Sequence, residues 1–402
     1  MLPRKRSRDE RDDGPDQPRQ AHQRRLYLIF DDWECGGYTI REINLSRRLD
    51  EDLRVDEQLT LPAPYMCLEA PRRLPWLFAA LGTRIMALHG FPQGPLPFLD
   101  VRSRGVTFGP WKGFQHLPIY FPVGDHDLFA LDTFSFRSLS LQPLSLCPPW
   151  LENPPRWSWR DLPKPPFSRR DDVTSYALHP DGHTILVGTA AGATFAFDTA
   201  AAAEPPMWEE RRHGEWTLLP FAGRAHFVRD LDALVGLSND PASLGHLCAA
   251  TTDDPAWKEI IGKEKLFSED PAERHVGATL VYMGGTEFCL VQCVSIGDTD
   301  DDAGQRQQQL QLQPHELLDQ LQQVLAALDQ GRLLEIEGFT ASPKRLNNVK
   351  PRYIYRLMTF SVCYDSDDGQ LTTGESCRLQ CYKLPEETSE ESFYHDPVAF
   401  WL

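Results

Sequence analysis

Short apolar runs separated by turn residues recur along the chain from residue 26 onward. The run 26–30 is continuously apolar, which is typical of a buried strand, whereas apolar and polar residues alternate over 38–45, which predicts a strand with one buried face. Runs of the same kind continue as far as residue 360. They predict six groups of strands, at 26–45, 76–108, 119–139, 173–199, 225–249 and 278–360. The pattern as a whole predicts an all-β protein.

One hairpin is especially well marked. Strand-like runs at 173–178 and 184–187 meet across His179-Pro180-Asp181-Gly182, where proline presets the turn and glycine supplies a positive φ. His179 and His183 flank Asp181, so a metal site is one interpretation of this spacing. We favour the other, in which Asp181 bonds the turn backbone, because no third or fourth ligand is evident.

Three strand-like runs end in aspartate, in two cases followed by threonine. These positions form a candidate repeat signature: Asp100, Asp132 with Thr133, and Asp198 with Thr199. Their separations of 32 and 66 residues fit a unit of about 33 residues. Each aspartate is expected to accept backbone N–H groups in an Asx-type turn. Repeated strand–turn units of this kind predict the blades of a β-propeller, with six blades for the six groups.

Two segments differ from this pattern. Residues 297–349 begin with an acidic and glutamine-rich stretch and then place leucines at helical spacing over 314–330, which predicts one amphipathic helix inside an insertion. The apolar face carries Leu317, Leu321, Val324 and Leu328. It either packs on the propeller, the more frequent outcome for such a face, or docks into a partner. The connector 147–167 contains Trp150, Trp157 and Trp159, and at least one of them is expected to fill a gap between adjacent sheets.

Charge narrows the classes of partner. The chain of 402 residues carries a net charge of −17, so a nucleic-acid-binding role for the folded body is not expected. Residues 1–25 are instead basic and lack apolar periodicity, which predicts a disordered tail. Arg4, Lys5, Arg6 and Arg8 in this tail are a candidate nuclear localisation signal, the alternative being a solubilising tail.

The sequence contains no apolar run long enough to cross a bilayer and no signal-peptide core, so we expect the protein in the cytoplasm, the nucleus or both. We also expect a monomer. The nine cysteines are an odd number and are expected to be free thiols. The pairs Cys289/Cys293 and Cys377/Cys381 have a C-x-x-x-C spacing, but residues four apart on a strand lie about 13 Å from each other, too far to share one zinc ion.

Catalytic motifs are not found. There is no glycine-rich phosphate loop, nucleophile elbow or His-Glu-x-x-His helix, so we expect no catalytic residue, no cofactor and no metal site.

Two family resemblances add to this interpretation. Residues 280–285, an apolar run followed by two glycines, and residues 195–199 resemble parts of a kelch repeat. More extensively, the chain resembles an uncharacterised family of plant proteins, abundant in cereals, that is grouped with kelch-like and F-box-associated propellers. The resemblance is carried by residues 26–33, 38–43, 76–88, 158–167, 173–184, 212–221, 235–248 and 273–293. It implies a single kelch-like β-propeller over 26–402 without an F-box and implies no established activity.

These observations predict a non-enzymatic scaffold that binds a protein or peptide, as a substrate-recognition module for example. Two alternatives stay open. One is a ubiquitin-ligase substrate receptor that uses the insertion 297–349 in place of an F-box. The other is a propeller that binds a carbohydrate or small molecule, or acts on one, at the centre of its ring.

Overall fold

The computed structural model of the chain describes the residues that position its strands. They are 24–32, 36–45, 58–69, 77–88, 95–110, 118–133, 135–141, 157–167, 172–200, 207–211, 219–251, 259–296, 352–385, 388 and 396–402. Statements about structure below concern these residues. Residues 1–23 of the predicted tail 1–25, the insertion 297–349 and the helix 314–330 within it lie outside them.

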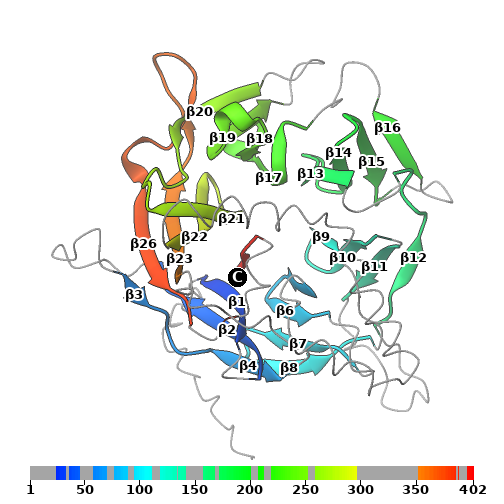
Figure 1. Cartoon of the computed structure of the whole chain (residues 1–402). Coiled ribbons are helices and arrows are strands. Elements are labelled where there is room, and N and C mark those ends of the chain that lie inside the picture. Colours follow the sequence, from blue (N-terminus) through cyan, green and yellow to red (C-terminus); the bar gives the residue numbers. More distant parts are fainter. Residues whose placement is uncertain are drawn as a thin grey trace, which may run out of the picture.

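The described strands form six antiparallel units of four strands, arranged around a ring (Figure 1). We call these units blades 1 to 6 and count the strands of each from the inner edge of the ring. Blade 1 consists of β27 (Val398–Trp401), β1 (Leu26–Asp32), β2 (Gly37–Ile43) and β4 (Met66–Glu69). Blade 2 consists of β5 (Phe78–Leu81), β6 (Arg84–Ala87), β7 (Pro97–Asp100) and β8 (Gly105–Phe108). Blade 3 consists of β9 (Ile119–Val123), β10 (Asp127–Leu131), β11 (Phe136–Ser140) and β12 (Arg160–Leu162).

The other three blades continue around the ring. Blade 4 consists of β13 (Val173–Leu178), β14 (Thr184–Thr189), β15 (Thr194–Asp198) and β16 (Trp208–Arg211). Blade 5 consists of β17 (Phe221–Val228), β18 (Ala233–Ser238), β19 (His246–Thr251) and β20 (Glu259–Lys265). Blade 6 consists of β21 (Glu273–Gly284), β22 (Glu287–Ile296), β23 (Arg352–Ser361) and β26 (Arg378–Lys383).

Few described elements fall outside the blades. β3 (Leu59–Thr60) pairs in parallel with β26, and β24 (Cys363–Tyr364) forms a hairpin with β25 (Leu371–Thr372). The helical elements of the described chain are three 3₁₀ turns, η4 (Arg229–Leu231), η5 (Pro241–Ser243) and η7 (Gly374–Ser376). No helix in this part of the chain has the length and apolar character needed to span a membrane. The fold is therefore an all-β propeller, as predicted, and the six four-stranded units fit the expected number of blades.

The hydrophobic core lies between the blades rather than at the centre of the ring. Each of six buried clusters joins two neighbouring blades, so every blade packs one sheet face against each neighbour. Between blades 2 and 3, Trp157 and Trp159 pack against the buried cluster, and the Trp157 ring stacks on Phe98 at a centroid distance of 5.9 Å. These tryptophans fill a gap between adjacent sheets, as the sequence predicted.

The ring closes through the two ends of the described chain. β27, from the C-terminal end, pairs antiparallel with β1, from Leu26↔Trp401 to Ile29↔Val398, and becomes the innermost strand of blade 1 (Figure 1). Backbone bonds between Arg25 and Leu402 extend this ladder. The hydroxyl of Thr279 on β21 donates to the carbonyl of Pro397 at 2.6 Å, so the C-terminal segment also holds blade 6 against blade 1. The sequence alone did not predict this closure.

Candidate functional site

The aspartates of the predicted repeat signature do not occupy equivalent places. Asp100 and Asp198 end the third strand of blades 2 and 4, whereas Asp132 follows the second strand of blade 3. Because neighbouring strands of a blade run in opposite directions, Asp132 lies on the opposite face of the ring from the other two. The predicted unit of about 33 residues is therefore wrong. An aspartate after an apolar strand is a local turn signal that any hairpin can use, so its spacing does not report the blade repeat.

Each aspartate bonds its own turn. Asp100 Oδ1 accepts N–H bonds from Arg102 at 3.0 Å and Ser103 at 2.9 Å, and Asp198 Oδ1 accepts one from Ala200 at 2.9 Å. Asp132 Oδ1 accepts the N–H of Thr133 at 2.9 Å. The five signature residues thus organise turns, and they do not converge on a common site.

A different contact recurs at equivalent places. In four blades, the N–H of the residue after the third strand donates to a carbonyl in the turn between the first and second strands. These bonds are Val101 to Thr83 at 2.9 Å, Leu141 to His126 at 2.6 Å, Thr199 to His183 at 3.2 Å and Val362 to Thr286 at 3.0 Å. The contact is made by backbone atoms, so it leaves no residue signature in the sequence.

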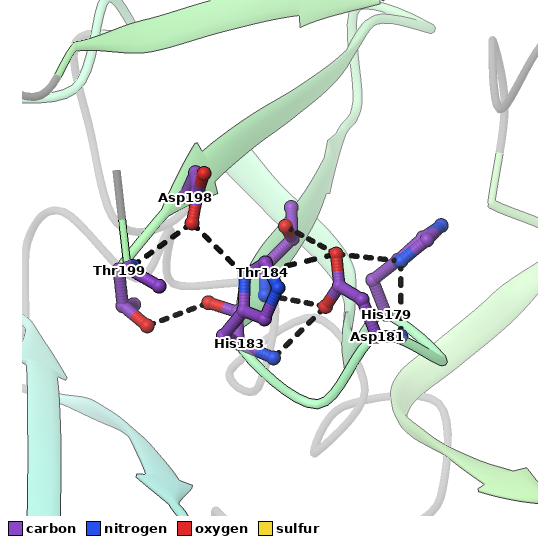
Figure 2. Close-up of polar contacts among 7 residues, drawn as sticks. His179, Asp181, His183, Thr184, Asp198 and Thr199 are labelled. Carbon is purple, nitrogen blue, oxygen red and sulfur yellow. Dashed lines mark hydrogen bonds and ion pairs between the residues drawn. The ribbon is translucent and has the colours of Figure 1, made fainter. Parts of the chain in front are cut away.

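The most connected polar cluster lies on this face of blade 4, in the hairpin that the sequence singled out (Figure 2). Asp181 Oδ1 accepts the backbone N–H groups of His183 and Thr184, each at 2.8 Å, and its Oδ2 accepts the Thr184 hydroxyl at 2.7 Å. His179 Nδ1 lies 3.0 Å from Asp181 Oδ2. Asp181 therefore bonds the turn backbone, which is the interpretation that the sequence favoured.

A second pair joins this turn to the end of β15. His183 Nδ1 lies 2.9 Å from Asp198 Oδ1, and the Thr199 hydroxyl donates to the His183 carbonyl at 2.7 Å (Figure 2). Hydrogen bonds and ion pairs thus link His179, Asp181, Thr184, His183, Asp198 and Thr199 in one network. In the described chain, no group of three or more histidine, cysteine, aspartate or glutamate side chains is arranged to hold a metal ion. We call this cluster the clamp, because it joins the turn between β13 and β14 to the end of β15.

The clamp yields a pH-dependent prediction. Burial acts to raise the pKa of Asp181, but the bonds from Thr184 and His183 and the charge of His179 outweigh it and lower the pKa to about 2. Asp181→Asn is therefore expected to lower the free energy of unfolding by roughly 1 kcal/mol at neutral pH. Because the folded-state pKa lies below the unfolded value of 3.8, this difference should be complete above pH 5 and shrink as the pH falls toward 2.

Urea unfolding of the two proteins across this pH range measures the difference. Asp125→Asn is the matched control, since Asp125 is exposed in the corresponding turn of blade 3. A difference that stays constant down to pH 2 would contradict the assignment of the clamp to the Asp181 carboxylate.

Two groups of predicted site residues cannot be compared with the structure. The candidate docking helix with Leu317, Leu321, Val324 and Leu328 lies outside the described residues. So does the candidate nuclear localisation signal at Arg4, Lys5, Arg6 and Arg8.

A groove lies at the outer edge of blade 5. It has a volume of about 460 Å³ and lies between the outermost strand β20 and the turn that joins β24 to β25. Its lining residues are Glu259, Ile260, Ile261, Gly262, Lys263, Asp368, Gly369 and Gln370. Figure 1 shows the β24–β25 hairpin as the orange segment beside β20.

The hairpin comes from blade 6 but is attached to blade 5. Lys263 Nζ forms ion pairs with Asp365 and with Asp368, the latter at 2.8 Å. Glu264 Oε2 accepts the backbone N–H of Thr373 at 3.1 Å, and its other oxygen accepts the Thr372 hydroxyl. These contacts hold the β24–β25 hairpin, which forms the wall of the groove, against β20, which forms its floor. The segment 365–369 is a hairpin turn, with β24 and β25 paired on either side.

The floor of the groove is a strand edge with little pairing. β20 pairs with β19 along one side, but on the other side its only partner among the described strands is β25, at Gly262. The backbone of 259–261 is therefore open toward the groove. Two carboxylates, Glu259 and Asp368, line the groove together with one ammonium group, Lys263. Lys263 is paired with Asp368 and with Asp365, which lies next to the groove.

The groove could not be predicted from the sequence. Lys263 and Asp365 are 102 positions apart, and the single bridge between Gly262 and Leu371 has no periodic signal. The three aspartates within 365–368 are residues typical of a turn, and their sequence pattern indicates nothing beyond a turn. Their second role depends on which strand the turn meets in the ring.

The chain matches a known protein family over most of its length. Residues 23–376 match the family described as "Protein of unknown function (DUF1668)". The chain belongs to this family. The DUF1668 match spans blades 2 to 5 and three of the four strands of blades 1 and 6, and it includes both sides of the groove. It ends before β26 and before the closing strand β27. No curated protein matches the chain.

Solved structures similar to this DUF1668 protein have low sequence identity. Hsv2 of Kluyveromyces lactis is 10% identical over 89% of this chain and 100% of its own, with a TM-score of 0.37. The β-propeller domain of Cps50 (Swd1) from Myceliophteria thermophila is 8% identical over 69% of this chain and 86% of its own, with a TM-score of 0.35. Such likenesses carry no argument about function. The propeller assignment rests on the strand pairing described above.

Proposed function

We propose that this DUF1668 propeller is a non-enzymatic scaffold that binds a protein partner through an extended basic peptide segment. The observation that carries the proposal is the groove beside β20. A strand edge that is open toward a groove can accept an added strand, whose main-chain bonds supply affinity while side pockets supply specificity. The residues around it offer charged, amide and apolar side chains beside the strand backbone.

The negative charge of the groove favours a basic peptide as its ligand. The lining carboxylates Glu259 and Asp368 outnumber Lys263, whose charge is also paired with Asp365, and the whole chain carries a net charge of −17. Both the local and the long-range field therefore favour a basic peptide. Half-buried Ile260 and Ile261 on β20 offer apolar contacts to alternate side chains of such a peptide.

Binding of labelled extended peptides, measured by fluorescence anisotropy, tests the proposal. Peptides that alternate lysine or arginine with valine are expected to bind, and matched peptides with glutamate in place of the basic residues are not. Glu259→Lys should weaken binding of the basic peptide by roughly five-fold or more, because it reverses a charge at the groove.

Glu209→Lys is the matched control. Glu209 is exposed on β16, the outermost strand of the neighbouring blade, and does not line the groove. Equal loss of binding in both variants would indicate only a general effect of net charge. Binding that neither variant changes, or the absence of any peptide preference, would refute the groove as the binding site.

A further inference from the structure

The innermost strand of blade 5 departs from regular pairing at its centre. The register between β17 and β18 shifts between Ala222 and His226, which marks a β-bulge, and Gly223 inside it has a φ of 72°. The bulged residues pair instead in parallel with β13 of blade 4, where Tyr176 lies opposite Arg224. The bulge thus brings a basic side chain to the inner edge of the ring, beside a phenol from the next blade.

Arg224 has no counter-charge there. Its side chain is half-buried, and its electrostatic neighbours are Tyr176 and His226. Within the described residues it forms no hydrogen bond and no ion pair. Burial lowers the pKa of the Arg224 guanidinium, yet an arginine stays protonated at neutral pH. A half-buried positive charge is therefore held at the inner edge of the ring, and no described carboxylate lies beside it.

The neighbours of Arg224 do not neutralise it. Burial and the charge of Arg224 lower the pKa of His226 to about 3, so this imidazole is neutral at pH 7. Its Nε2 lies 3.2 Å from the carbonyl oxygen of Leu280 and is already occupied. The Tyr176 hydroxyl forms no hydrogen bond within the described chain and is available as a donor.

We propose that Arg224 and Tyr176 form a binding site for a small oxyanion, a phosphate or carboxylate group, at the inner edge of the ring between blades 4 and 5. A cation withdrawn from water without a partner is costly, and an anion that binds it recovers that cost. The guanidinium offers a planar fork of donors that matches two oxygens of phosphate or carboxylate, and the phenol adds a third donor. This site is separate from the β20 groove and takes a ligand of opposite charge.

The site does not depend on long-range attraction. The net charge of −17 repels anions, so binding must come from the short-range bonds of Arg224 and Tyr176. Monovalent chloride, which presents no pair of oxygens to the fork, should bind much less well than phosphate or acetate at equal ionic strength.

Thermal unfolding of the full chain tests the proposal, with sodium phosphate and sodium acetate as separate probes and sodium chloride at matched ionic strength as the reference. The wild-type melting temperature should rise by roughly 3 °C when the anion is about one hundred times its Kd. A rise with phosphate alone would assign a phosphoryl ligand, and a rise with acetate alone a carboxylate. Isothermal titration calorimetry should give one site per chain.

Arg224→Gln should abolish the anion-induced rise and should melt no lower than the wild type in the absence of anion, since it removes an unpaired charge. Arg378→Gln, at an exposed position on β26, should keep the full rise. The proposal is overturned if neither anion stabilises the wild type beyond chloride, or if Arg224→Gln keeps the rise. It is also overturned if Arg224→Gln melts lower than the wild type without anion, because Arg224 would then have a structural role.

Discussion

Phe400→Pro is expected to lower the free energy of unfolding by about 3 kcal/mol or more, because it breaks the closure of the ring. Arg25 and Leu402 exchange both backbone hydrogen bonds, at 2.8 and 3.1 Å. Pairs in an antiparallel ladder alternate, so Tyr27 and Phe400, two positions further along, form the next hydrogen-bonded pair. Proline at 400 removes that N–H donor and leaves a carbonyl of the buried strand β1 without its partner.

Ala399→Pro is the matched control for this effect. By the same alternation, the N–H of residue 399 points away from β1, and β27 is an edge strand, where proline is tolerated. Urea unfolding should therefore show a clearly larger loss of stability for Phe400→Pro than for Ala399→Pro. Equal losses would mean that the last strand contributes through its side chains alone and that its ladder with β1 is not what closes the ring.

Phe136→Ala is expected to cost about 3–5 kcal/mol of unfolding free energy, the range for deletion of a fully buried aromatic ring. Phe136, on β11 of blade 3, is 1% exposed. Its ring lies 4.9 Å from that of Phe197 and 5.0 Å from that of Trp208, both on blade 4. The substitution leaves a cavity at the contact between two blades, where neither sheet can close it without shifting as a whole.

Phe108→Ala serves as the control because it removes a phenylalanine ring from a position that is mostly exposed to solvent. Phe108 is 64% exposed at the outer edge of blade 2, and its loss should change stability by no more than about 0.5 kcal/mol. Both variants are compared with the wild type by urea unfolding. A small effect of Phe136→Ala would indicate that the blades repack freely, contrary to the role of these clusters as the core.

Individual strands could be predicted because each is an apolar run with its own local pattern. The hairpin over 173–187 is the clearest case, since Pro180, Asp181 and Gly182 act on neighbouring backbone atoms and Asp181 makes the bonds that its position predicted. The aspartate repeat failed for the same reason. Asp132 satisfies a local turn as well as Asp198 does, so local chemistry could not show that the two lie on opposite faces of the ring.

The candidate binding sites could not be predicted, because each joins residues that the chain separates widely. The groove exists only where the 365–370 turn of blade 6 meets Lys263 of blade 5. The oxyanion site depends on Tyr176 and Arg224 becoming neighbours through parallel pairing of two inner strands. The predicted strand group begins at residue 225, so Arg224 was not part of any predicted site.

By itself, the sequence determined the all-β class, the position of most strands, the tight turns and the acidic net charge. Alternation of apolar and polar residues and turn residues act locally, and net charge is a sum over the residues. Only the tertiary structure decided which strands close the ring, which turns share a face, and where an open strand edge and an unpaired arginine are presented. Those features come from contacts between distant segments, and the physical reason is that such contacts form only when packing of the blade faces brings the segments together.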